Sequence, residues 1–322
     1  MELLPVEMLN EILLQVDKST LFDAAQVCKR WRHLAVKQVV PIKNCQDFNS
    51  ACRIDDRLSI IRSKYVDSWL DNGFIAACQG GHQDLVQLMI TKGAHNWNGA
   101  LYSACQGGHR ALAQLMITKG AYDWNSGLYS ACRSGHQTLV DLMITNGAND
   151  WNGGLNGACK GGHQALVDLM ITNGAYDWNG ALNGACQGGH QELVYLMITK
   201  GANNWNGGLE SACVGGQQEV AELMIDKGAN DWNYALYGAC RSGHEKLVQL
   251  MIDKGANAWN GALASSCQGG HQTLVQLMIT KGANYWNGAL YGACVGRQQA
   301  LVQLMIAKGA DRCWCGKSLA LH

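Results

Sequence analysis

The sequence predicts an all-α protein in which a short N-terminal helical module precedes a helical-repeat solenoid. Cysteine recurs at a constant step of 27 residues, methionine and tryptophan recur at the same step, and the intervals between them carry helical hydrophobic spacing. The cysteines that keep this step are Cys78, Cys105, Cys132, Cys159, Cys186, Cys213, Cys240, Cys267 and Cys294. We therefore assign residues 72–310 to nine copies of one unit, preceded by a separate module at residues 1–45.

The composition argues against several classes of function. The chain carries 25 basic and 25 acidic side chains, which gives a formal net charge of zero. Binding to a phosphate backbone depends on excess positive charge, so we expect no nucleic-acid partner. Glu2, Glu7 and Glu11 interrupt the apolar start of the chain, and no run approaches the roughly 20 apolar residues of a spanning helix. We expect a soluble monomer without a membrane partner, in the reducing cytoplasm or, as a second location, the nucleus.

Residues 1–45 stand outside the repeat. Their apolar side chains follow helical spacing in three stripes, the first formed by Leu9, Ile12, Leu13 and Val16. Three helices of this length bury too little surface to form a convincing independent domain, so they need the array or a partner. One interpretation of the segment is a three-helix cap for the solenoid.

The same segment resembles the F-box, the helical module that docks a substrate receptor on the Skp-type adaptor of SCF ubiquitin ligases. Leu-Pro near the start and Val-Cys-Lys-x-Trp near the end occur in the order and at the spacing of that family. Proline suits a helix start because its missing N–H would be unpaired there anyway. The resemblance implies an adaptor-binding face formed or supported by Leu4, Pro5, Leu9, Ile12, Leu13, Val27, Cys28 and Trp31.

Residues 46–71 keep only traces of a unit, such as Ala51-Cys52, and lack its Gly-His and Gly-Ala pairs. We predict a degenerate capping repeat there. Residues 311–322, which include Cys313-Trp314-Cys315, contain no full unit, and we predict a C-terminal cap.

Each full unit, such as Trp97–Asp123, predicts two helices. The stretch 100–105 has the spacing of a short helix with one apolar stripe. The stretch 112–117 has too many apolar positions for one narrow face, so we expect neighbouring units to cover it on two sides. Gly120 suits the left-handed position that ends the second helix, and Asn98 is a candidate N-cap of the first.

The pattern ALxxACxxGHxxLVxLMIxxGA resembles the ankyrin repeat, whose inner helix carries LHxAA, whose turn carries GH and whose outer helix carries VVxLLLxxGA. The family period is about 33 residues, and the six residues missing here fall between Ala121 and Leu128, where the family's β-hairpin finger projects. The resemblance implies an ankyrin-like solenoid, and the shortening predicts loops with little or no strand. Repeats with this sequence pattern and a shortened finger are similar to those encoded by giant DNA viruses of amoebae.

The rows of cysteine and histidine suggest metal sites or disulfides, but the spacing opposes both. Equivalent side chains of stacked helices lie about 8–10 Å apart. A disulfide needs Cα atoms within about 7 Å, and zinc needs ligand atoms about 2.0–2.3 Å from one ion. We interpret the cysteines as buried core residues and the histidines as turn residues that hydrogen-bond backbone between units. We predict no metal site and no cofactor.

The sequence contains no nucleophile elbow, no phosphate loop and no carboxylate pair outside the repeat rhythm, so we predict that the protein is not an enzyme. The tryptophans are interpreted as structural staples at helix starts. The acids of the inter-unit loops are interpreted as solvated; they are Asp123, Asp150, Asp177 and Asp231.

Two positions of the first helix vary among the copies while their neighbours do not, which is typical of a solvent-facing row. Tyrosine and arginine, the types that most often anchor interfaces, occur at both ends of the array. The residues that we predict to bind a target protein are Tyr102, Tyr129, Arg133, Lys160, Glu210, Tyr237, Arg241 and Tyr291. Neutral drift at exposed sites is the alternative, with the loops at Tyr122-Asp123 and Asn149-Asp150 as the next candidates.

These predictions combine into one function and one alternative. The F-box would dock on a Skp-type adaptor while the array holds an unidentified target protein for ubiquitin transfer by other subunits. The alternative is a non-catalytic scaffold or decoy that sequesters a host protein without any ligase connection.

Overall fold

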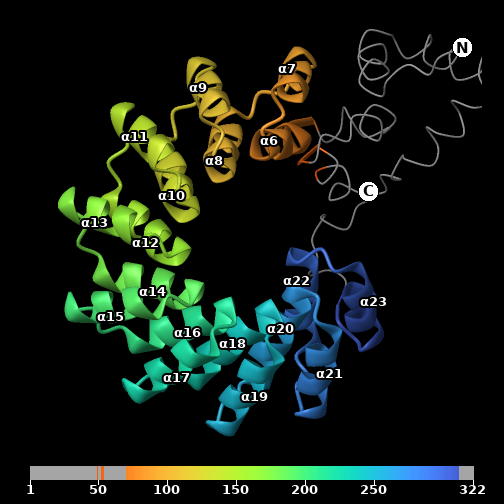
Figure 1. Ribbon diagram of the computed structural model, residues 1–322. Helices are drawn as coiled ribbons and strands as arrows, with labels where there is room; N and C mark the ends of the chain where they lie inside the picture. The colour runs from red at the N-terminus through yellow and green to blue at the C-terminus, as the bar shows by residue number, and fades with distance from the viewer. Residues whose placement is uncertain (1–48, 50–51, 54–69, 312–322) are drawn as a thin grey trace, which may run out of the picture. The chain divides into compact units, whose positions relative to one another are not determined.

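The computed structural model describes residues 49, 52–53 and 70–311. Over the main described range, 70–311, it contains 18 helices and no strand. The helices alternate as nine pairs, and we call the first member of each pair the inner helix and the second the outer helix (Figure 1). The chain divides into two units, Met1–Asn96 and Trp97–His322, which are described separately.

The first unit contributes one described pair, α6 (Leu70–Gly80) and α7 (Gln83–Thr91). The inner helices of the second unit are α8 (Trp97–Gly107), α10 (Trp124–Ser134), α12 (Trp151–Gly161), α14 (Trp178–Gly188), α16 (Trp205–Gly215), α18 (Trp232–Ser242), α20 (Trp259–Gly269) and α22 (Trp286–Val295). Its outer helices are α9 (Arg110–Thr118), α11 (Gln137–Thr145), α13 (Gln164–Thr172), α15 (Gln191–Thr199), α17 (Gln218–Asp226), α19 (Glu245–Asp253), α21 (Gln272–Thr280) and α23 (Gln299–Ala307).

The all-α repeat predicted from the sequence is confirmed for the described residues. Each inner helix of the second unit begins at a tryptophan. The loops that replace the finger between described pairs carry no strand, and Gly120 after α9 has a φ of +105° in the left-handed region. The segments 1–45 and 46–71, apart from residues 49, 52–53 and 70–71, and the tail beyond residue 311 lie outside the described residues, so the predicted boundaries stay predictions.

The caps of the inner helices differ from the prediction. Asn98 is the second residue of α8 and therefore is not its N-cap. In the following units the cap is the residue before the tryptophan: Asp150 Oδ1, for example, accepts from the backbone N–H of Gly153 at 2.9 Å. An acid there satisfies an orphan N–H and complements the positive end of the helix dipole. The loop aspartates predicted to be merely solvated are therefore helix caps; those that accept such a bond are Asp123, Asp150, Asp177 and Asp231.

The asparagine of each Trp-Asn pair joins its unit to the loop that follows. Asn152 Oδ1 accepts from the backbone N–H groups of Tyr176 at 2.8 Å and Asp177 at 2.9 Å. The same paired bond recurs in the second unit at Asn98, Asn125, Asn179, Asn206, Asn233 and Asn260. In the first unit the carboxylate of Asp71 accepts the equivalent pair, from His95 and Asn96. One side chain per repeat thus satisfies two loop N–H groups that no strand is present to pair.

The turn between inner and outer helix depends on glycine and histidine together. Gly135, with φ of +79°, ends α10, and a Cβ there would lie 2.6 Å from Cε1 of His163 in the next unit. His271 Nε2 donates to the backbone oxygen of Arg241 at 3.1 Å, and His244 makes the same bond across units. The predicted hydrogen bonding of histidine to backbone between units is confirmed at these positions.

The core lies between the inner and outer helices. Leu101, Cys105 and Met116 have no exposed surface, and their equivalents along the array are buried in the same way. Burial raises the pKa of the Cys105 thiol from 9.0 to about 12, because ionisation would place a charge in apolar surroundings. The last cysteine of the 27-residue series differs from the others. Cys294 is half-buried and disulfide-bonded, whereas the sequence predicted a buried free thiol there.

Successive inner helices pack closely along the second unit. At Gly157 of α12 a Cβ would lie 2.6 Å from the backbone oxygen of Tyr129 in α10, so glycine permits this approach. Figure 1 shows the consequence for the array from α8 to α23, in which the inner helices line the inside of a curve and the outer helices its outside. The inner helices therefore form one continuous surface.

Candidate protein-binding surface

The predicted target-binding residues all lie on inner helices of the second unit. They belong to α8, α10, α12, α16, α18 and α22. Tyr291 is 59% exposed and Arg241 is also exposed, whereas the remaining members are half-buried. We call these eight residues the inner row; they are Tyr102, Tyr129, Arg133, Lys160, Glu210, Tyr237, Arg241 and Tyr291. Whether the inner row binds a target stays a prediction.

The inner row is built on i, i+4 spacing within single helices. Tyr129 and Arg133 of α10 share a helix face, as Tyr237 and Arg241 of α18 do four units further along. The adjacent positions Leu128 and Cys132 are buried without exposed surface. The core residues therefore fix the helix orientation, and the side chains of the inner row can change without changing the packing.

Two basic side chains of the inner row lie next to each other on neighbouring helices. Lys160 of α12 occupies the position in its unit that Arg133 occupies in α10. Burial, followed by the positive charge of Arg133, lowers the pKa of Lys160. The second contribution shows that the two cations are close enough to repel each other.

An aromatic pair extends the row on α18. The rings of Tyr234 and Tyr237 lie 5.8 Å apart at an interplanar angle of 57°, and Tyr234 is 60% exposed. Sequence reasoning missed Tyr234. A signal was present in the sequence, since the other repeats of the second unit carry glycine or serine at this position. The Tyr237 ring also packs on the next unit: a Cβ at Gly261 would lie 2.5 Å from its Cζ.

The loops that were the next candidates also expose aromatic side chains. Tyr122 is 75% exposed and Tyr176 is 73% exposed, at the same position of units two apart. Asn149, between them, is exposed but not aromatic. These loop residues lie at the edge of the array rather than on its continuous inner-helix surface, so they serve as matched comparisons for the inner row.

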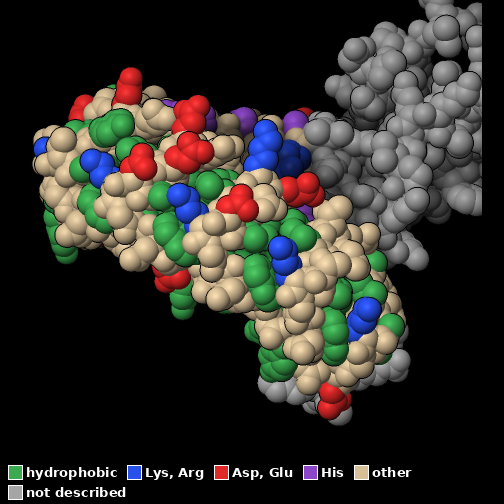
Figure 2. Space-filling model, turned by 90° about the horizontal axis from the view of Figure 1, so that it is seen from below, with side chains coloured by type: hydrophobic (Ala, Val, Ile, Leu, Met, Phe, Trp, Pro, Cys, Tyr) green, Lys and Arg blue, Asp and Glu red, His purple; other side chains and the backbone are tan. Residues whose placement is uncertain are grey.

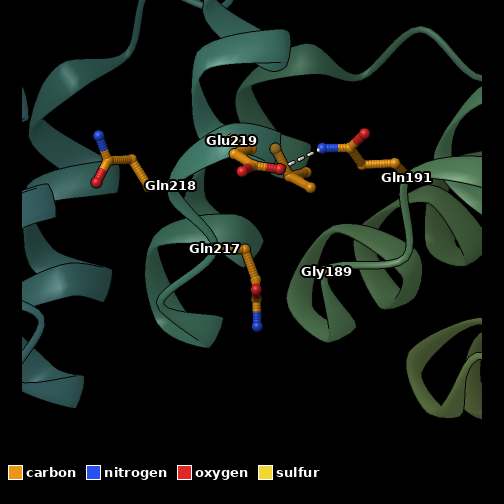
Figure 3. A pocket seen from close by; sticks show the side chains of 6 residues that line it. Gly189, Gln191, Gln217, Gln218 and Glu219 are labelled. Atoms are coloured by element: carbon orange, nitrogen blue, oxygen red, sulfur yellow. Dashed lines mark hydrogen bonds between the residues drawn. The ribbon is translucent and has the colours of Figure 1, made fainter.

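A shallow recess lies at the turn edge between α14–α15 and α16–α17 (Figure 3). Its volume is about 310 Å³. Figure 3 shows Gln191 donating to Glu219, a hydrogen bond of 2.8 Å that crosses two units. Gln217 stands here in place of the usual histidine. Glu219 is the sole charged residue among those lining it; the lining residues are Gly189, Gln191, Gln217, Gln218, Glu219 and Val220.

Charge on the described surface is mixed rather than segregated. On the face seen in Figure 2, basic and acidic side chains are interspersed among hydrophobic and uncharged polar groups.

Among residues 49, 52–53 and 70–311 the structure contains no group of three histidine, cysteine or acidic side chains placed to hold a metal ion. No helix in that part of the chain combines the length and apolar character that crossing a membrane requires.

Two segments of the chain match models of known protein families. Residues 1–40 match the F-box-like family model, and residues 74–153 match the model of three ankyrin repeats. Among solved structures, the human ASB11 ankyrin repeat domain is 24% identical, with 55% of this chain and 96% of that chain covered and a TM-score of 0.34. A search of curated proteins found no match.

The chain thus combines an N-terminal segment similar to the F-box-like family with a repeat array that is all-helical over the described residues and similar to ankyrin repeats. Both matched families are protein-interaction modules. The F-box residues assigned from the sequence, Leu4 to Trp31, fall inside the matched range but outside the described residues.

Proposed function

We propose that this protein recruits substrates to an SCF-type ubiquitin ligase. The F-box docks on a Skp-type adaptor, the array binds a target protein, and other subunits carry out ubiquitin transfer, so this chain is not itself the enzyme. The observation that carries the proposal is the F-box-like match at residues 1–40 on the same chain as an ankyrin-like array. The sequence predicts that this takes place in the cytoplasm, with the nucleus as a second location.

The geometry of the array supports the target-binding half. Its core and its asparagine bonds repeat almost unchanged, whereas the inner row varies in size, charge and aromatic character. A rigid scaffold that presents variable side chains on one surface is suited to hold a macromolecular partner. Tyrosine and arginine, at six of these eight positions, supply side-chain types that dominate binding energy in interfaces.

The adaptor half is tested with the purified full chain and a Skp-type adaptor on a size-exclusion column. We expect co-elution, and we expect the double variant Ile12→Ala, Leu13→Ala to abolish it. The helical signal of the array should be unchanged and its thermal midpoint should stay within about 2 °C of the parent, since side chains that serve a partner rather than the array contribute little to its stability.

Lys119→Ala, an exposed change after α9, is the control that should leave co-elution intact. A parent chain that fails to bind the adaptor contradicts the proposal and favours the scaffold or decoy. A large loss of array stability in the double variant would instead assign the N-terminal segment to capping.

A further inference from the structure

Arg133 and Lys160 form a basic pair without an acidic partner on the continuous inner-helix surface. They lie in the last turns of α10 and α12, and both side chains are half-buried. Gly161, the residue after Lys160, lies against the backbone oxygen of Arg133, so the two side chains begin at neighbouring points of the surface. Among the described residues neither side chain forms an ion pair, and the charge of Arg133 disfavours the charged form of Lys160. Two like charges held together in this way favour binding of an anion.

Helix capping does not explain the pair. A cation in the last turn of a helix interacts favourably with the negative end of the helix dipole, but only weakly at an accessible site. The equivalent positions of α8, α14 and α20 carry neutral glutamine, and those helices have the same length. The fold therefore does not require a positive charge there, which leaves the pair available to a partner.

The nearest inner-row residue of opposite charge offers a second charged contact to a bound partner. Glu210 of α16 lies two units beyond Lys160, and among the described residues it also has no recorded ion pair. Successive helices pack about 8–10 Å apart, so the two points are separated by about 16–20 Å. An extended chain covers about 3.3 Å per residue, so about five or six residues would span them.

We propose that the inner surface binds an extended peptide segment whose Asp or Glu carboxylate sits between Arg133 and Lys160 and whose Lys or Arg, about five or six residues away, pairs with Glu210. This rests on the proposed function and names the chemistry of its target. Tyr129, one turn before Arg133 on the same face, packs beside the carboxylate. A nucleic-acid backbone fits less well, because Glu210 would repel its phosphates.

The test is selection of a random 16-residue peptide library displayed on phage against the immobilised full chain, followed by synthesis of the enriched peptides. We expect enrichment of an acid and a base about five or six residues apart. Binding should fall at least tenfold in the double variant Arg133→Gln, Lys160→Gln. It should be unchanged in Lys119→Gln, Lys200→Gln, which removes the same charge at exposed sites directly after the outer helices α9 and α15.

A charge swap provides the second measurement. The variant Lys160→Glu should no longer bind the peptides selected on the parent. It should instead bind the peptide in which the acidic residue is changed to Lys. Peptides that need Tyr129 but are indifferent to Arg133 and Lys160 would overturn this inference and leave the proposed function standing. Failure to select any binder contradicts this inference, whereas the proposed function is contradicted by failure to co-elute with the adaptor. A single-stranded oligonucleotide that binds and depends on the basic pair would assign the surface to nucleic acid instead.

Discussion

At the scale of single residues, the buried cysteines show how position in the repeat sets chemistry. Cys105, Cys132 and Cys159 have no exposed surface, and burial raises the pKa of each thiol from 9.0 to about 12. A thiol that stays protonated is a poor nucleophile and a poor metal ligand. Core packing was therefore predictable from the 27-residue step. The disulfide at Cys294 was not, because that residue keeps the same step as the free cysteines and the repeat carries no signal that separates it from them.

The cysteine row predicts a loss of stability at alkaline pH. The folded pKa lies above the unfolded value, so the stabilisation is complete below pH 9 and is lost as pH rises towards 12. Each thiol that ionises only on unfolding lowers the free energy of unfolding by about 1.4 kcal/mol between pH 8 and pH 10. The variant Cys132→Ala, Cys159→Ala, Cys186→Ala should thus lose about 4 kcal/mol less than the parent over that range.

Urea midpoints at pH 8 and pH 10, measured with reductant present, give this comparison directly. Reduced stability of the triple variant at pH 8 is expected from lost packing and does not enter the comparison. Equal pH dependence in parent and variant would show that the thiols are not protected by burial.

At the scale of the elements, helix positions followed from hydrophobic spacing but helix caps did not. The sequence placed the cap at Asn98, one residue inside the helix, and treated the loop aspartates as solvated. Capping preference is local, whereas the Asn98 partners lie 24 and 25 residues further along, in the following loop. Only the folded array brings these groups together, so no local rule could assign the role of the asparagine. The aspartate cap is different, because the N–H that it accepts from lies three residues further along, within reach of the capping rule.

The asparagine bond predicts a specific mutational result at Asn152. Changing Asn152 to Ala leaves two loop N–H groups without their acceptor, and we expect a loss of about 1–3 kcal/mol in the free energy of unfolding. Asn152→Asp should retain most of the stability, because Asp71 already accepts the equivalent pair in the first unit. Thermal and urea unfolding of both variants would measure this; equal destabilisation by Ala and Asp would contradict the proposed role of the side-chain oxygen.

At the scale of the molecule, contacts between neighbouring repeats decide which sequence positions repeat and which can vary. Core positions, turn glycines and the asparagine row are held by contacts between neighbouring units, so their pattern could be recognised in the sequence. The inner row varies among the repeats, and this variation alone predicted it, although the ring of Tyr237 also packs on the next repeat at Gly261. Tyr234 was missed because it lies outside the two variable positions that predicted the inner row, although the other repeats of the second unit carry glycine or serine there; its ring contact with Tyr237 places it on the same surface.

The central claim is that the inner row holds the target, and capture from lysate by parent and variant chains tests it most directly. Proteins captured by the parent would be quantified by mass spectrometry beside Tyr102→Ala, Tyr129→Ala, Arg133→Ala and the loop control Tyr122→Ala, Tyr176→Ala. We predict that the inner-row variant weakens capture of a defined protein at least about tenfold, or about 1.4 kcal/mol, with its melting unchanged and the loop control unaffected. Capture that survives this variant and also survives Tyr237→Ala, Arg241→Ala would contradict the claim.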